Sequence, residues 1–217
     1  MRGPRLLASL LAALALGACA ASAAFAEPEF LPGKAGTTLT GKSKKVKLQA
    51  KAGGTIECTA SKTEGELTSK TTESLLLDLE GCKALGLKAN SPGDVGGVIL
   101  INATAELCFV NLSPLEAGLI VKPTSAIIID IPATGEELEI KNDFVGKIEP
   151  INTSSFGGQI VISQKGGVQS IDGCRNASNE LVKHSLTMAE NGGTPKQSGL
   201  EVVEGTIAYA IEQELMA

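Results

Sequence analysis

The chain has 217 residues, of which 24 are acidic and 19 are basic, and its formal net charge is −5. An acidic balance argues against general nucleic-acid binding, which needs a basic surface, so we expect no nucleic-acid partner. The chain has no tryptophan and only six other aromatic residues. We therefore expect an aliphatic core, and sites that stack sugars or bases on aromatic rings are disfavoured.

The first 26 residues have the three parts of a secretory signal peptide. Arg2 and Arg5 give a positive start, Leu6 to Leu16 form an uncharged apolar run, and Ala24-Phe25-Ala26 precedes Glu27-Pro28. This run is shorter than the roughly 20 residues that a membrane-spanning helix needs. We therefore predict a secreted or cell-envelope protein whose mature part, residues 27–217, has no transmembrane span. That part holds 17 basic and 24 acidic residues, which gives a net charge of −7.

A second cleavage site competes with the first. Leu16-Gly17-Ala18-Cys19 resembles a bacterial lipobox, in which the cysteine is lipidated and becomes the first residue. Several attached lipid chains would hold the protein on a membrane. We favour release after Ala26, because Ala-x-Ala before Glu-Pro is a good signal-peptidase boundary. The alternative is a lipoprotein anchored through Cys19.

Four cysteines remain after Cys19 is set aside, namely Cys58, Cys82, Cys108 and Cys174. An even number in an exported chain indicates two disulfides. Three pairings are possible, and we favour Cys58–Cys82 with Cys108–Cys174 because the first pair brackets a short stretch of adjacent strands. A metal site is disfavoured, since the chain has no Cys-x-x-Cys and only one histidine, and we expect no cofactor.

Apolar residues alternate with polar ones along much of the mature chain, which is the pattern of half-buried strands. The clearest examples are Val46, Leu48 and Ala50; Leu75, Leu77 and Leu79; Leu138 and Ile140; and Ile207, Tyr209 and Ile211. Two runs, Val98 to Ile101 and Ala126 to Ile131, are apolar on both faces and suit central strands. Glycine pairs punctuate the chain, as in tight hairpins. We predict one all-β domain over residues 27–217, an antiparallel sandwich or barrel of about a dozen short strands.

Gly36 to Ser43 matches the phosphate-binding loop pattern letter for letter. That loop must leave a buried strand and open a helix whose N-terminal amides hold the phosphate. Here the following residues, Lys44 to Lys51, alternate as a strand does. We therefore interpret the match as a turn between strands.

Lys42, Lys44, Lys45 and Lys47 belong to a basic run without an acidic residue. This run is a candidate contact for anionic cell-wall polymer or a membrane surface. The simpler interpretation, which we favour, is an edge strand kept soluble by its lysines.

His184 is the only histidine, so a Ser–His–Asp triad would have to use it. Neither a Gly-x-Ser-x-Gly elbow nor a Ser-x-x-Lys pair accompanies it, and we interpret it as a structural or exposed residue. Glu136, Glu137, Glu139 and Asp143 form an acidic cluster that fits solvated hairpin charges better than a glycosidase pair. We therefore expect no catalytic residues.

Several segments of the mature chain resemble a group of uncharacterised exported proteins of soil actinobacteria. They are Phe30-Leu31-Pro32-Gly33 through Leu48, Gly54 to Cys58, Leu79 to Cys82, Leu107-Cys108, Gly173-Cys174 and Gln213 to Ala217. The resemblance implies a bacterial, secreted, disulfide-containing β domain, and it implies no activity, ligand or catalytic residue.

The leading hypothesis is a non-catalytic exported β domain that acts at the cell envelope or outside the cell through binding or structural contacts. A small-ligand carrier with an apolar barrel interior is the alternative. A hydrolase with an unrecognised site is the third possibility.

Overall fold

The computed structural model describes residues 27–175 and 179–217, and every regular element in them is a β-strand. The predicted all-β class is therefore confirmed, with a closed eight-stranded barrel at its centre. The signal peptide and Cys19 lie outside the described residues. Within the described residues no helix could cross a membrane.

The barrel is an antiparallel meander in which each strand pairs with the next barrel strand along the chain. The last strand closes the ring by pairing with the first, Leu39 lying opposite Tyr209. The eight strands are β2 (Thr38–Ser43), β5 (Ala60–Leu67), β6 (Thr72–Glu80), β9 (Val98–Leu112), β10 (Leu115–Pro123), β13 (Phe144–Glu149), β14 (Ser154–Ile162) and β20 (Lys196–Met216).

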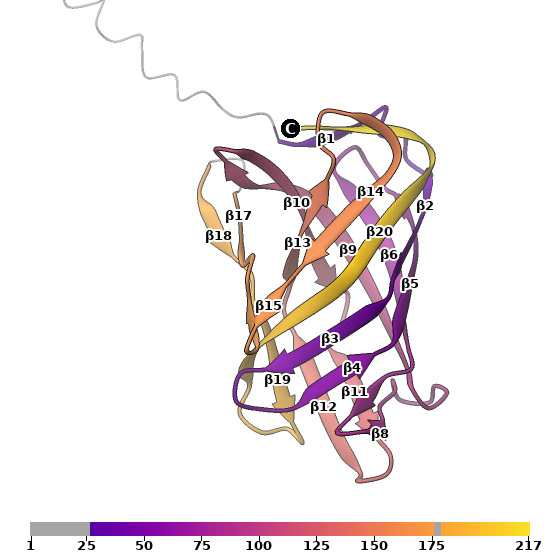
Figure 1. Cartoon of the computed structure of the whole chain (residues 1–217), viewed down its shortest axis with the longest axis vertical. Helices are drawn as coiled ribbons and strands as arrows, with labels where there is room; N and C mark the ends of the chain where they lie inside the picture. Colours follow the sequence, from indigo (N-terminus) through magenta and orange to yellow (C-terminus); the bar gives the residue numbers. More distant parts are fainter. Residues whose placement is uncertain (1–26, 176–178) are drawn as a thin grey trace, which may run out of the picture.

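Every second connection of the barrel carries extra strands. Because alternate connections of an antiparallel meander lie at the same end, these insertions all start from one end of the barrel. Most of them extend the barrel there, where β8, β11 and β12 are seen in Figure 1, whereas β17 and β18 lie along the barrel wall. The inserted strands are β3 (Lys45–Ala50) and β4 (Thr55–Cys58), β7 (Lys83–Ala84) and β8 (Leu87–Lys88), β11 (Ile127–Ile131) and β12 (Glu136–Lys141), and β15 (Gln164–Lys165), β16 (Val168–Gln169), β17 (Gly173–Arg175), β18 (Leu181–Lys183) and β19 (Leu186–Glu190). At the opposite end, β1 (Glu29–Leu31) pairs with the end of β20.

The longest strand, β20, joins the two halves of the molecule. Its first part pairs with β3 and its second part with β2. Between them Glu204 has a positive φ of 53°, and Gly205 lies so close to β14 that an added Cβ would be 2.7 Å from the Ile160 carbonyl oxygen. This irregularity lets one strand serve both the barrel and its extension.

The core is a single cluster of buried aliphatic side chains that runs through the barrel and the extension. Phe30, Phe144 and Tyr209 are its only aromatic members among the described residues, as the composition predicts. Several details differ from the expectation. The strands number twenty in the described part of the chain, and β9 and β20 are long, with 15 and 21 residues. β11, expected at a sheet centre, pairs along one side only, with β12, apart from one bridge between Asn90 and Asp130.

Candidate binding site

The four cysteines of the mature chain form two disulfides, Cys58–Cys82 and Cys108–Cys174. This is the pairing that the sequence favours. The first bond lies in the insertion end, beside β4 and β7. The second joins barrel strand β9 to β17, which lies outside the barrel wall. Two disulfides indicate an oxidising environment.

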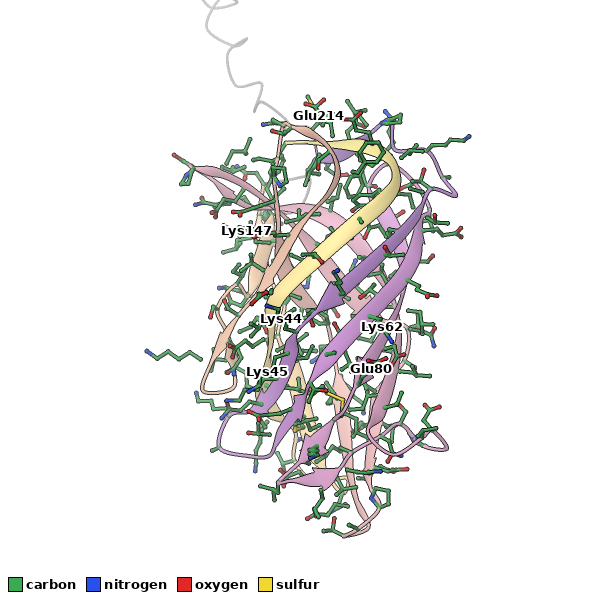
Figure 2. All side chains as sticks on the ribbon, turned by 45° about the vertical axis from the view of Figure 1, so that its right-hand side comes forward. Lys44, Lys45, Lys62, Glu80, Lys147 and Glu214 are labelled. Atoms are coloured by element: carbon green, nitrogen blue, oxygen red, sulfur yellow. A yellow bond between two sulfur atoms is a disulfide. The ribbon has the colours of Figure 1, made fainter. Side chains whose placement is uncertain are left out.

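The lysine run does not lie on an edge strand, so that interpretation of it is wrong. β2 pairs with both β5 and β20, and β3 with both β4 and β20. Acidic side chains of these neighbours lie beside the lysines: Lys44 is 2.6 Å from Glu204, and Lys45 is 3.4 Å from Glu57. Figure 2 shows Lys44 and Lys45 on the outer surface of this sheet. The sheet therefore mixes charges instead of forming a purely basic patch.

The fold also shows what becomes of the phosphate-loop match and of the acidic cluster. The phosphate-loop match folds as a turn followed by strand β2, and no helix follows it. The acidic cluster is divided, because Glu139 forms an ion pair with Lys141 at 2.8 Å while Asp143 contacts His184. The described residues hold no group of three or more side chains able to bind a metal ion.

The β17–β18 hairpin, called the flap hairpin below, covers one patch of the barrel wall. Its strand β17 pairs with β9 through Arg175 and Phe109. Cys174 packs with three outward-facing residues of the wall, Cys108, Ile120 and Val145, in a second small core. The disulfide and this core together fix the flap hairpin to the barrel.

A pocket of about 210 Å³, called the flap pocket below, lies between the flap hairpin and the wall. Its walls are largely apolar and are formed by Leu107, Phe109, Leu112, Ile120, Val182 and the Cys108–Cys174 disulfide. Its polar lining includes His184, Arg175, and the ion pair of Lys122 with Glu106, whose Nζ and Oε2 atoms are 2.5 Å apart. An apolar pocket with a few convergent polar groups is the usual form of a small-ligand site.

His184 is the best-placed polar group of the flap pocket. Its side chain is only 10% exposed, and its Nδ1 lies 3.1 Å from Oδ2 of Asp143. The His184 backbone N–H also donates to the Asp172 carbonyl oxygen at 2.7 Å, which fixes the residue at the base of the flap hairpin. With Nδ1 donating to the carboxylate, Nε2 carries the free lone pair. This Nε2 atom is buried and has no hydrogen-bond partner.

Arg175 provides a second unsatisfied polar group. Its NH1 group donates to the Asn179 carbonyl oxygen at 3.0 Å, whereas its buried Nε has no partner. Buried polar atoms are nearly always hydrogen-bonded, so two exceptions lining one pocket call for a ligand or water. The guanidinium is always charged and favours an oxyanion.

The described lining of the flap pocket holds no free hydroxyl or thiol. None of its lining residues is Ser, Thr or Tyr, and both lining cysteines are in the disulfide. Among the described lining residues, the Asp143–His184 pair therefore has no hydroxyl or thiol partner of the kind that a catalytic triad uses.

The barrel interior contains an acidic residue that sequence reasoning missed. Glu73 is fully buried, and its Oε1 accepts a hydrogen bond from the Tyr209 hydroxyl at 2.8 Å, while Oε2 has no partner. Burial raises the pKa of the Glu73 carboxyl to about 7, and the bond from Tyr209 opposes part of this rise. The cavity beside Glu73 measures about 60 Å³. That volume can hold water but is less than a third of the volume of the flap pocket.

The fold and the pocket place the chain in the broad class of disulfide-linked antiparallel β-barrels. Comparison with known protein families, curated proteins and solved structures finds no significant match.

Proposed function

We propose that this chain is an exported, non-catalytic binding protein of the cell envelope or extracellular space, and that it binds a small organic acid in the flap pocket. The observation that carries the proposal is the pair of unsatisfied buried atoms, His184 Nε2 and Arg175 Nε, in a pocket that also has apolar walls. The ligand binds as a carboxylate together with one proton from solvent, which occupies His184 Nε2 and is donated in a hydrogen bond to the ligand, so that the imidazolium lies between the Asp143 carboxylate and the ligand carboxylate. The apolar walls receive the body of the ligand.

Two features favour this proposal over the other hypotheses. The interior cavity of about 60 Å³ is too small for the lipid or pigment that a carrier would hold there. The described lining of the flap pocket offers His184 no hydroxyl or thiol to activate, as a hydrolase of the Ser–His–Asp or Cys–His type requires. Binding of an acid uses the two unsatisfied atoms and the apolar walls of the pocket, and it requires no nucleophile.

Export is supported by the signal-like first 26 residues and by the two disulfides, which suit an oxidising compartment. The resemblance to exported actinobacterial proteins points the same way. Release after Ala26 would leave Glu27, which lines the flap pocket, as the first residue. The intact mass of the exported protein distinguishes this product, which begins at Glu27, from one lipidated at Cys19.

We expect His184→Ala to weaken binding of benzoate to the mature protein at least tenfold. The substitution removes the hydrogen bond between the imidazole and the ligand carboxylate, at a cost of about 1.5–3 kcal/mol for a hydrogen bond to a charged group. Isothermal titration with a series of acids from acetate to benzoate measures this, and the larger apolar acids should bind more tightly because they fill the pocket.

Lys183→Ala is the matched control, since Lys183 is exposed and pairs with Asp172 at 2.6 Å outside the pocket. It should leave the affinity within twofold of the wild type. Equal affinity of the His184→Ala variant and the wild type, with both folded, would remove the basis of the proposal.

A further inference from the structure

The β7–β8 hairpin, residues 83–88 and called the tip hairpin below, lies at the insertion end of the barrel, where β8 is labelled in Figure 1. Its two-residue turn is Leu85-Gly86, with φ angles of 50° and 83°. Two positive φ angles define the type I′ turn, whose first position normally holds Asn, Asp or Gly. A leucine in this left-handed conformation is a genuine outlier.

Packing does not explain Leu85, because its side chain is 89% exposed, the most exposed of the large hydrophobic residues in the described chain. The residue is therefore unfavourable in two independent ways, in its backbone conformation and in its contact with water. An outlier that the fold does not need points to a function.

The charges of the tip hairpin are also locally unfavourable. Lys83 and Lys88 are exposed and face each other directly across the two strands. Like charges in this position destabilise a hairpin. Lys83 and Leu85 also line one side of an open trough whose other side holds Lys44 and Lys45. Glu57 is the only acidic residue among the lining residues of this trough.

A second exposed apolar residue lies in the loop beside the tip hairpin. Val95 is 78% exposed. Its loop lies against the hairpin: the Cys82 N–H donates to the Gly97 carbonyl oxygen at 2.8 Å, and a Cβ added to Gly96 would be 3.1 Å from the side chain of Lys88. This loop also contains one acidic residue, Asp94. The two lysines of the tip hairpin, Lys83 and Lys88, outnumber it, so the surface formed by the hairpin and the loop is mainly basic.

We propose that the tip hairpin is a membrane-contact site, at which Leu85 and Val95 insert among the headgroups of an anionic bilayer while Lys83 and Lys88 contact the lipid phosphates. Exposed apolar side chains flanked by lysines are the combination that binds peripheral proteins to anionic lipid. Such a bilayer relieves two of these unfavourable features. It removes the Leu85 side chain from water, and its phosphates screen the repulsion between Lys83 and Lys88. The proposal rests on the proposed export only for its setting, and it is independent of the flap pocket.

The decisive variant is Leu85→Asn, which should have opposite effects on folding and on binding. Asn suits the left-handed turn position, so we expect Tm to rise by about 2 °C. Binding to vesicles of phosphatidylglycerol and phosphatidylcholine, measured by co-sedimentation of the mature disulfide-bonded protein, should fall at least tenfold. Phe156→Asn is the control, because Phe156 is 61% exposed but lies in β14, away from the tip hairpin; it should leave vesicle binding unchanged.

Lys83→Gln combined with Lys88→Gln should weaken vesicle binding about thirtyfold and lower its dependence on salt, since each lysine near an anionic surface strengthens binding about fivefold. The proposal is overturned if the wild type ignores anionic vesicles, or if Leu85→Asn binds them as tightly as the wild type does. It is also overturned if soluble polyphosphate binds equally well to the wild type and to Leu85→Asn and displaces the vesicles completely, because the partner would then be an anionic polymer. Benzoate binding by the Leu85→Asn variant should remain intact, so failure of this proposal is separable from failure of the binding-site proposal.

Discussion

Glu73→Gln is expected to stabilise the folded chain by about 3 kcal/mol at pH 8 and to change its stability little at pH 4. The pKa of Glu73 rises from 4.5 to about 7 on folding, so the folded state holds its proton more tightly than the unfolded state does. The wild type therefore loses stability as the pH rises from about 4.5 to 7, and it keeps the full penalty above pH 7. Gln has the same shape, accepts the Tyr209 hydrogen bond and stays neutral.

Chemical denaturation of both proteins at pH 4, 6 and 8 measures this difference directly. Glu66→Gln is the matched control, because Glu66 lies on the neighbouring strand β5 but is exposed. Its free energy of unfolding should follow that of the wild type at every pH. If the Glu73→Gln and wild-type stabilities ran parallel from pH 4 to pH 8, Glu73 would already be ionised in the folded chain at acidic pH, and the description of the barrel interior would be incorrect.

Cys108→Ala with Cys174→Ala is expected to produce the largest loss of stability, about 4 kcal/mol. This disulfide links residues 66 positions apart, and cross-linking so long a loop removes much of the conformational freedom of the unfolded chain. The same pair of substitutions also opens the small core that holds the flap hairpin against the barrel. We therefore expect benzoate binding to be lost even where the barrel remains folded.

Cys58→Ala with Cys82→Ala provides the comparison. The Cys58–Cys82 disulfide joins residues only 24 positions apart, so its removal should lower the free energy of unfolding less, by about 3 kcal/mol. Because this disulfide lies at the insertion end, we expect no change in benzoate affinity. Thermal unfolding and titration of both double variants separate the two roles. Equal benzoate affinity in the Cys108–Cys174 variant and the wild type would show that the flap hairpin does not form the site.

The class of fold can be predicted from the sequence because it depends on local alternation. Leu75, Leu77 and Leu79 occupy one face of β6, and this pattern requires a strand with one buried side. Closure into a barrel cannot be predicted in this way, since it depends on pairing Leu39 with Tyr209, 170 positions later in the chain. The edge-strand interpretation of the lysine run failed for the same reason, because long-range pairing decides which strands are edges.

The binding residues were harder to predict because they meet only in the folded chain. His184 and Asp143 are 41 positions apart, and neither lies in a recognisable motif. The sequence does contain an indication of Glu73. It lies two and four positions before Leu75 and Leu77, so in a strand its side chain points to the same buried face as theirs. The sequence also contains an indication of the tip hairpin, in the pair Leu85-Gly86. A leucine is unusual at the first position of a two-residue turn, where a positive φ is needed.

A nuclear magnetic resonance titration of the ¹⁵N-labelled mature protein with benzoate tests the central claim most directly. The account predicts saturable shifts confined to the flap hairpin and the facing wall, with a large change at the His184 Nε2 resonance as it forms a hydrogen bond with the ligand carboxylate. Shifts centred instead on residues that line the barrel interior, such as Leu75, Leu119 and Ile207, would indicate a carrier. That result, or the absence of any saturable shift across the series of organic acids, would contradict the assignment of the flap pocket as the binding site.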